Sequence, residues 1–502
     1  MTFVQKQLPT YRASALATCL LMVIGLLSIT APLGAQATPF TDIPCPFDTA
    51  PLLVSVRCGV MVVPENRQNP ESGTIALTVM IAESKNPDQA SDPVVYLTGG
   101  PGEGAIAAMT PIFSSEVGLE LVRDRDWIVV DQRGTGYSVP RLDCNIFGIA
   151  RIASPSALQE ASEACYQRYA AAGIDLASYT TEENAADIAA LREAMGYAEW
   201  NLFGVSYGTT LALTIMDRFP EGIRSVVLDS TLPPEYSFFV TDVQTKLESL
   251  QQVFDTCAAD PACNSAYPEL GARFELAVQA LNAEPLDLGG LPLNGDFLVF
   301  ALTNTSVFQR ETIQQLPALL DAALNGDVSG LGDLLGGVAS GSDSDVSLET
   351  SSVAANDGMG LAMNCNGPGL FPGLREQLAQ LSEEGAAATA LAGLYLRYLD
   401  ACAPWVTGLP EVTPPAPVDS SIPTLFFAGE WDSGTPARFA QEAAAQMAQA
   451  QVVLFPGQGH SVLLGADNAC PANLLNQFLA EPATAVDTAC VDRFYPPIQF
   501  SS

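Results

Sequence analysis

The stretch around Ser206 places a serine where it could act as a nucleophile. In the segment 204–208, G-V-S-Y-G, the serine stands between two glycines, after an apolar run and before a helical pattern. Glycine on both sides lets the strand and the helix approach closely, because it has no side chain. A serine on such a sharp turn is exposed for attack on a carbonyl carbon. A plain strand-to-helix turn is the alternative, so the chain must also supply a base, an acid and an oxyanion hole.

The base is predicted from the composition. A serine hydroxyl is a weak nucleophile until a base takes its proton. His460 is the one histidine of the sequence, so any serine–histidine mechanism must use it. It lies in a glycine-rich loop directly after the last predicted strand, 451–455. We therefore predict that His460 is the general base.

Asp432 is the predicted acid, because it follows the predicted strand that precedes the histidine strand. A carboxylate there would hold the imidazole of His460 in its productive tautomer. Asp229, which ends an earlier predicted strand, is the alternative. Asp131 also ends a strand but lies ahead of the serine, so we expect it to be structural and to pair with Arg133 or with neighbouring amides.

Two backbone N–H groups are expected to bind the oxyanion of a tetrahedral intermediate. One is that of Tyr207, the residue after the serine, and the other is that of Gly100. Gly100 belongs to G-G-P-G, residues 99–102, which follows another apolar strand and lets the backbone approach closely. A plain turn is the alternative for this loop.

The loops that carry these residues all follow short apolar segments. Such segments alternate with helical patterns, which predicts a parallel sheet with right-handed crossovers. Their uniformly apolar composition suits buried parallel strands. Thr180 and Glu183 form a capping box that predicts a helix over 182–195. The predicted strands are an antiparallel pair, 58–64 and 74–82, followed by 93–97, 127–130, 200–205, 225–228, 423–428 and 451–455.

The strand pattern is interrupted between 233 and 418, where the chain has the pattern of helices and loops. We therefore predict four parts. Residues 1–37 form a signal peptide, 38–232 the first part of an α/β core, 233–418 a helical cap insertion, and 419–502 the second part of the core with the acid and the histidine.

The N-terminus predicts export. Lys6 and Arg12 precede an apolar run, and Ala35-Gln36-Ala37 offers a small-x-small cleavage site. An uncleaved membrane anchor is the alternative, since about 20 apolar residues can span a bilayer. Cleavage gives a secreted protein, extracellular or periplasmic, for which we expect no membrane partner. Its oligomeric state cannot be predicted.

Charge and cysteine content limit the partners. A formal net charge of −35 repels nucleic acid and anionic membranes, so we expect neither as a partner. The charge fits simple solubility or attraction of cationic substrates such as peptide amino termini. Ten of the eleven cysteines follow the signal segment, which predicts disulfides. Pairing of sequence neighbours is the simplest arrangement, although other connectivities remain open. With one histidine and no C-x-x-C, we expect no metal site and no cofactor.

Taken together, the motifs resemble those of the α/β-hydrolase peptidases of the prolyl and tripeptidyl aminopeptidase group, and most closely the secreted tripeptidyl-aminopeptidase-like branch. The resemblance spans about residues 45–490 and implies an α/β-hydrolase fold. This fold has a mostly parallel central sheet, helices on both faces and an inserted, mainly helical cap. Thr98 stands where a histidine often precedes G-G-P-G, and Glu103 where a small residue is common. The motifs that carry the resemblance are 97–102, 131–138, 204–208, 429–432 and 459–460.

The resemblance implies a secreted serine exopeptidase that releases tripeptides or single residues from free peptide amino termini. It also implies that carboxylates of the cap bind the substrate ammonium. Glu103 and Glu430 are candidates for substrate binding, although Glu103 could instead face solvent. An esterase acting on small uncharged esters with the same triad is the second hypothesis. A catalytically inactive binding protein is a third, disfavoured because serine, acid and histidine are all present.

Overall fold

The structure is a computed structural model that describes most of the chain after the predicted signal peptide, which lies outside the described residues. The described residues are 39–144, 146, 155–288, 291–303, 308–327, 355–366, 370, 373–406, 414–466 and 468–500.

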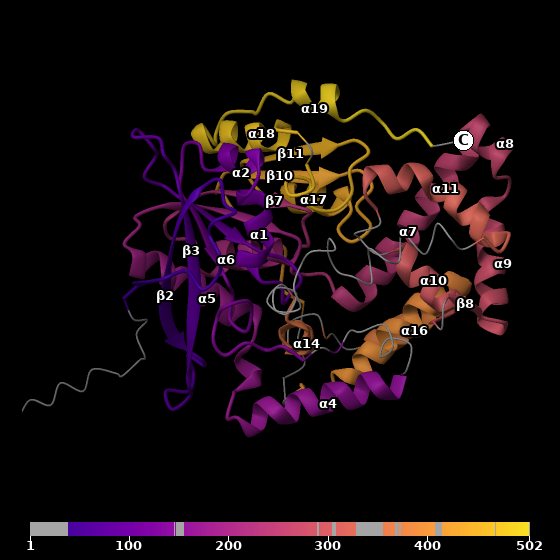
Figure 1. Ribbon diagram of the computed structural model, residues 1–502, viewed down its shortest axis with the longest axis horizontal. Coiled ribbons are helices and arrows are strands. Elements are labelled where there is room, and N and C mark those ends of the chain that lie inside the picture. The colour runs from indigo at the N-terminus through magenta and orange to yellow at the C-terminus, as the bar shows by residue number, and fades with distance from the viewer. Residues whose placement is uncertain are drawn as a thin grey trace, which may run out of the picture. The chain divides into compact units, whose positions relative to one another are not determined.

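A nine-stranded sheet forms the centre of the molecule (Figure 1). Its strand order is β1-β2-β3-β5-β4-β6-β7-β10-β11. Every neighbouring pair from β5 to β11 is parallel, whereas β1, β2, β3 and β5 pair antiparallel in turn. The prediction of a mostly parallel central sheet is therefore confirmed. The strands are β1 (Thr41–Ile43), β2 (Ser55–Pro64), β3 (Thr74–Glu83), β4 (Val94–Leu97), β5 (Trp127–Val130), β6 (Trp200–Val205), β7 (Ile223–Asp229), β10 (Thr424–Gly429) and β11 (Ala450–Phe455).

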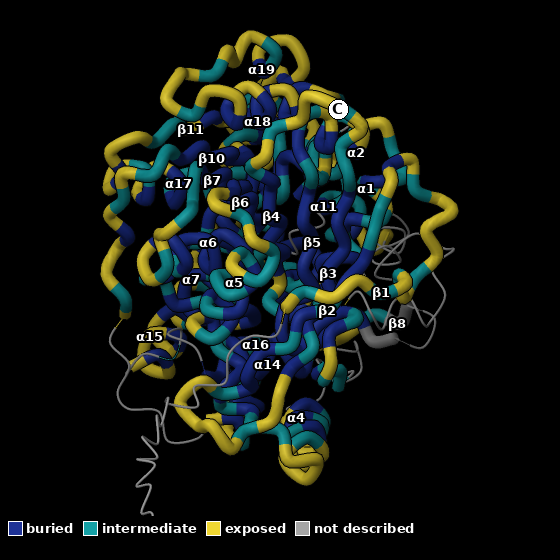
Figure 2. Tube along the Cα trace, turned by 90° about the vertical axis from the view of Figure 1, so that its left-hand side faces the viewer, coloured by how far each residue is buried: buried dark blue, intermediate teal, exposed yellow. Residues whose placement is uncertain are grey.

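The central strands are buried because helices cover both faces of the sheet. Side chains alternate across a strand, so Val95 and Leu97 of β4 join one apolar cluster and Val94 and Tyr96 join the other. Figure 2 accordingly draws these strands in dark blue. The first cluster includes side chains of α5 (Thr181–Met195) and α6 (Tyr207–Arg218). The second includes those of α1 (Ala105–Phe113), α2 (Glu116–Leu121), α18 (Cys470–Ala480) and α19 (Ala489–Phe494).

The start of α5 follows the predicted capping box in part. Thr180 is the N-cap, and its hydroxyl accepts a hydrogen bond from the backbone N–H of Glu183. This bond satisfies one of the N–H groups that a helix leaves unpaired in its first turn. The helix ends at Gly196, whose φ of 75° is a conformation that glycine adopts easily.

Between β7 and β10 the described chain is mainly helical, and α7, α9, α10, α11 and α16 pack on one another (Figure 1). A short hairpin of β8 (Leu286–Leu288) and β9 (Leu291–Leu293) interrupts them. The helices are α7 (Phe238–Ala259), α8 (Pro261–Ala266), α9 (Leu270–Ala283), α10 (Gly295–Leu302), α11 (Arg310–Leu324), α14 (Asp357–Asn366), α15 (Leu374–Leu381) and α16 (Ala386–Ala401). The last helix between two strands of the sheet, α17 (Ala437–Ala444), joins β10 to β11.

One helix from the first part of the chain packs on the inserted helices. This helix, α4 (Pro155–Ala171), contacts α16 although it precedes β6 in the sequence. Ser162 of α4 donates a hydrogen bond to the carbonyl of Ala401, at 2.6 Å, and accepts one from the indole of Trp405, at 2.8 Å. The segment 155–171 therefore extends the layer of inserted helices.

Five disulfides join cysteines that are neighbours in the sequence, so the simplest pairing is confirmed. They are compatible with an oxidising compartment. Among the described residues, no helix combines the length and apolar character that crossing a membrane requires. The pairs are Cys45–Cys58, Cys144–Cys165, Cys257–Cys263, Cys365–Cys402 and Cys470–Cys490.

Candidate active site

Ser206 occupies the turn between β6 and α6. Its φ of 56° and ψ of −125° are rare for a residue with a side chain and cost about 1–3 kcal/mol. The turn closes because its neighbours are glycines. A Cβ on Gly208 would lie 1.9 Å from the carbonyl oxygen of Leu97, and one on Gly204 would lie 2.5 Å from that of Gly208. The strained turn presents the serine at the end of the strand.

His460 is hydrogen-bonded to the predicted acid. Its Nδ1 lies 2.9 Å from both carboxylate oxygens of Asp432. The same carboxylate accepts bonds from the N–H groups of Gly434 and Thr435, at 2.9 and 2.8 Å, and from the Thr435 hydroxyl at 2.8 Å. This set of donors fixes the carboxylate, and the carboxylate orients the imidazole.

The pair shifts the pKa values of both groups. Burial by itself would raise the pKa of Asp432, but the imidazole and the donors from Thr435 outweigh it and leave that pKa below its ordinary value. Burial by itself would lower the pKa of His460, but the carboxylate of Asp432 raises it above its ordinary value, with a contribution from Asp229. The pair therefore favours an imidazolium.

Asp229, the alternative acid, holds the loop that follows the histidine. Its fully buried carboxylate accepts bonds from the N–H groups of Val462 and Leu463, at 2.9 and 2.8 Å. Burial raises its pKa to about 6. Within the described part of the chain, Asp432 is therefore the carboxylate bonded to His460, and Asp229 positions the backbone behind it.

The G-G-P-G loop passes beside the serine. A Cβ on Gly99 would lie 3.0 Å from the Cβ of Ser206, so the loop backbone is close to the predicted nucleophile. Gly100, Ser206, Tyr207 and His460 line one cavity of about 300 Å³. The structure therefore brings the predicted nucleophile, base and both predicted oxyanion donors to the same space.

Asp131 joins the start of α1, which follows this loop in the sequence, to the segment 131–138. Its carboxylate accepts bonds from the N–H groups of Ile106, at the start of α1, and of Tyr137, at 2.9 and 2.7 Å. Burial raises its pKa to about 7. The predicted structural role agrees with these contacts. Its partners are backbone amides, and Arg133 pairs elsewhere.

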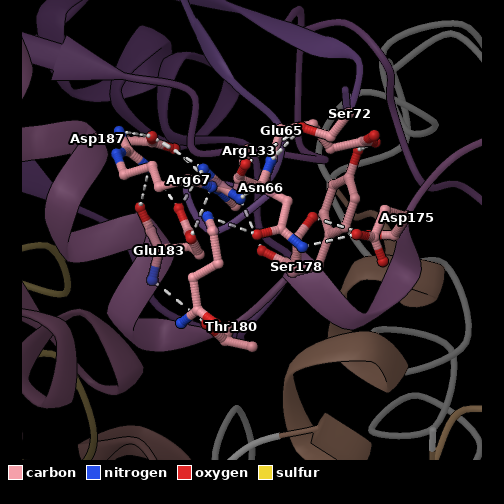
Figure 3. Close-up of polar contacts among 12 residues, drawn as sticks. Glu65, Asn66, Arg67, Ser72, Arg133, Asp175, Ser178, Thr180, Glu183 and Asp187 are labelled. Carbon is pink, nitrogen blue, oxygen red and sulfur yellow. Dashed lines mark hydrogen bonds and ion pairs between the residues drawn. The ribbon is translucent and has the colours of Figure 1, made fainter. Parts of the chain in front are cut away.

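Arg133 connects the segment 131–138 to α5 through an ion pair with Asp187 (Figure 3). Its buried guanidinium binds both carboxylate oxygens of Asp187, at 2.8 and 2.9 Å, and donates to the carbonyls of Glu65 and Ser178. Arg67 binds the same Asp187 at 2.6 Å. Bidentate arginine–carboxylate contacts fix both position and orientation, so this network anchors the segment 131–138. Gln132 of that segment donates a hydrogen bond to the carbonyl of Thr98, the residue before the G-G-P-G loop, at 3.1 Å.

The described lining of the cavity includes neither Glu103 nor Glu430. Glu103 keeps exposed surface and accepts a bond from the Thr98 hydroxyl at 2.8 Å. The surrounding protein raises its pKa by desolvation, against the opposing effects of Thr98 and His460. Glu430 accepts a bond from the N–H of Gly457 at 2.8 Å, so it supports the loop that leads to the histidine. Substrate binding by either residue stays a prediction.

A family model described as alpha/beta hydrolase fold matches residues 92–467, which is most of the chain. The chain belongs to this family. The match includes every residue of the predicted site, and the order serine, acid, histidine is the order known for the α/β-hydrolase fold.

Relatives with peptidase names also match. A tripeptidyl aminopeptidase of Streptomyces coelicolor is 30% identical over 195 residues, 36% of this chain and 36% of the relative. A proline iminopeptidase of Neisseria gonorrhoeae is 32% identical over 146 residues, 29% of this chain and 34% of the relative. The chain thus matches about a third of the length of each. The structure of a proline iminopeptidase of Mycobacterium smegmatis has 17% identity and a TM-score of 0.39, covering 82% of this chain and 96% of that one. The two sequence relatives confirm the predicted resemblance to this group.

The inserted helices of this α/β-hydrolase contribute cavity residues that the sequence reasoning missed. Asp242 and Lys246 of α7 and Tyr395 of α16 line the cavity with the serine and the histidine. They lie within helices and outside any motif, so no local pattern marks them. The one available signal was composition, because the chain contains only three lysines.

Proposed function

We propose that this α/β-hydrolase is a serine peptidase that releases short peptides or single residues from free peptide amino termini. One observation carries the proposal. His460, held by Asp432 at 2.9 Å, lines the same cavity as Ser206 and the backbone of Gly100 and Tyr207. Relatives named tripeptidyl aminopeptidase and proline iminopeptidase support a peptide substrate rather than another acyl compound.

The proposed reaction begins with the hydroxyl of Ser206, which gives its proton to Nε2 of His460 and attacks the carbonyl carbon of the scissile amide. Asp432 keeps the proton on Nδ1 and stabilises the imidazolium that forms. The N–H groups of Gly100 and Tyr207 stabilise the negative charge that develops on the carbonyl oxygen.

Collapse of the tetrahedral intermediate breaks the C–N bond. The leaving amine takes the proton from the imidazolium, and the acyl group stays on the serine as an ester. Water, deprotonated by the neutral His460, then attacks the ester carbonyl. The C–O bond to Ser206 breaks, the serine oxygen takes the proton from the imidazolium, and the N-terminal fragment leaves as a carboxylic acid.

The free amino terminus needs an anionic partner near the reaction. Glu103 is the candidate, because it directly follows the G-G-P-G loop that passes beside Ser206, and because the charge of His460 opposes the rise in the pKa of its carboxyl. Its hydrogen bond to Thr98 fixes one oxygen. If the substrate ammonium binds there, only a few residues fit between the amino terminus and the scissile bond at Ser206. This limit gives an exopeptidase its short products.

We also propose that the protein is exported and that residues 233–418 act as the cap. The five disulfides support export, since they persist in oxidising compartments. The mainly helical insertion between β7 and β10, which supplies part of the cavity lining, supports the role of a cap.

A pair of fluorogenic substrates tests the proposal. We expect a tripeptide amide with a free amino terminus to be cleaved and its N-acetylated twin to be resistant, because acetylation removes the ammonium group. Ser206→Ala is the control and should remove turnover of both. Equal turnover of the two amides would refute the aminopeptidase, and turnover of short acyl esters alone would favour the esterase.

A further inference from the structure

A single lysine stands in the cavity of a very acidic protein. The chain contains three lysines and has a formal net charge of −35. Lys246 lies on α7, its side chain is 9% exposed, and it lines the cavity that contains Ser206 and His460. Burying an ammonium group costs free energy unless it is paired, so its presence beside the predicted nucleophile needs an explanation.

Asp242, one helical turn before the lysine, supplies part of that explanation. Its Oδ2 lies 2.6 Å from Nζ of Lys246, and the hydroxyl of Tyr395 donates to the same oxygen. The ammonium group of Lys246 neutralises this carboxylate, and the Tyr395 hydroxyl hydrogen-bonds to it. Among the described residues of the cavity lining, Asp242 is the one carboxylate. Asp242 is therefore occupied with holding the lysine, which makes it a poor site for a substrate ammonium.

The lysine keeps hydrogen-bonding capacity beyond this pair. An ammonium group has three N–H donors. Within the described part of the chain, Asp242 is its one ion-pair partner. Thr241, which also lines the cavity, offers a further hydroxyl, while Phe238 and Phe300 provide apolar walls. A donor-rich position with apolar walls favours an anion with an aliphatic stem.

We propose that Lys246, oriented by Asp242 and Tyr395, forms a subsite for a carboxylate group of the substrate. The inference rests on the proposed function, because it assigns a preference to the same reaction. The lysine acts near the reacting groups, since its charge opposes the rise in the pKa of His460. It would repel a substrate ammonium, so the two charged ends of a substrate would be bound at different places, the ammonium near Glu103 and the carboxylate on α7.

A substrate carboxylate has two possible sources, an acidic side chain or the α-carboxylate of a short peptide. Two sets of substrates separate them. The first is a series of fluorogenic tripeptide amides with a free amino terminus, in which glutamate and glutamine are exchanged at each position. The second is a neutral tetrapeptide with a free C-terminus and its C-terminal amide, followed by chromatography.

For at least one of these substrate pairs, we expect kcat/KM to be at least about tenfold higher for the member with the carboxylate. A charge-assisted hydrogen bond in a desolvated pocket stabilises a complex by about that factor. Lys246→Met should reduce that ratio to about one, and Lys246→Arg should retain most of it. Lys85→Met, which removes an exposed lysine outside the described cavity lining, is the matched control and should leave the ratio unchanged.

Loss of Lys246 leaves Asp242 unpaired, so the variant could fold poorly. The double variant Asp242→Asn/Lys246→Met removes both charges and should also give a ratio of about one. The ratio of kcat/KM for the acidic and the neutral substrate is measured on one protein preparation. A loss of folded protein lowers both values equally and leaves the ratio unchanged. Labelling of Ser206 by a fluorophosphonate reports the folded fraction.

The outcomes are distinct. A wild-type enzyme that cleaves the neutral amides but prefers no carboxylate at any position overturns the subsite, as does an acidic preference that persists in Lys246→Met. In both cases the proposed function stands. If the wild-type protein cleaves no peptide amide at all, the proposed function fails, and the subsite fails with it.

Discussion

At the scale of single residues, the Asp432–His460 pair controls when the proposed base is available. The base works only as a neutral imidazole, so kcat/KM should rise with pH as the imidazolium loses its proton. Asp432 holds the pKa of His460 above its ordinary value. The rising limb should therefore lie above about pH 6.5, the ordinary value for histidine.

The variant Asp432→Asn tests this pair. Without the carboxylate, burial of the imidazole dominates and lowers the pKa of His460, so the rising limb should move to lower pH. The rate should fall by about 10⁴, because the imidazole loses its productive tautomer and the partner of its positive charge. A pH–rate profile on a fluorogenic amide measures both effects. If the rising limb of the profile lies at the same pH in Asp432→Asn, a group other than His460 determines its position.

The sequence contains enough to predict residues that lie in motifs directly after strands. Ser206, Asp432 and His460 can be predicted because each follows an apolar strand in a glycine-containing loop, and because the chain contains one histidine. In the sequence, chain order alone favours Asp432 over Asp229 as the acid. Their strands β10 and β7 are neighbours, with Asp229 opposite Phe427, so only the side-chain contacts distinguish the two carboxylates.

At the scale of elements, the turn from β6 to α6 depends on close backbone packing. A Cβ on Gly208 would lie 1.9 Å from the carbonyl oxygen of Leu97, and its nearest neighbours are all backbone atoms of Leu97 and Thr98, so no flexible side chain can move aside. Gly208→Ala should therefore destabilise the fold by several kcal/mol, on the order of the cost of overpacking a core, and abolish activity.

Gly393→Ala is the matched control. Gly393 lies inside α16, where a Cβ would meet nothing closer than a terminal nitrogen of Arg397, at 3.5 Å. Alanine is a better helix former, so this change should stabilise the protein by up to about 1 kcal/mol. Chemical denaturation measures both variants. Equal stability of the two would contradict the close packing of the turn.

Contacts between elements that lie far apart in the chain cannot be predicted from local sequence patterns. The packing of α4 on α16 depends on Ser162 and Trp405, which are far apart in the chain and belong to no motif. Lys246 and Asp242 are four residues apart on α7, a spacing common on solvated helix faces. Only the folded structure shows that this pair lines the same cavity as Ser206 and His460.

At the scale of the whole molecule, disulfides stabilise the inserted helices. Cys365–Cys402 joins α14 to the end of α16 and closes a loop with a sequence separation of 37 residues. Replacing both cysteines by alanine should lower the free energy of unfolding by about 2–5 kcal/mol, mainly because the unfolded chain gains freedom.

Thermal unfolding with and without reductant measures this effect. Wild-type protein should lose stability when reduced, and the double variant should lose less. A reductant effect of the same size in both proteins would show that this disulfide contributes little. Asn364, which lines the cavity, is adjacent to Cys365, so KM should rise in the double variant even where the protein is folded.

The central claim is that Ser206 is an acyl-transfer nucleophile activated by His460. The most direct measurement is covalent labelling with a fluorophosphonate, followed by peptide mapping. The account predicts one adduct, on Ser206, with no labelling of Ser206→Ala. In His460→Ala labelling should be slower by about three orders of magnitude or more, because the chain has no second histidine to act as base. An adduct on another residue, or an unchanged rate in His460→Ala, would contradict it.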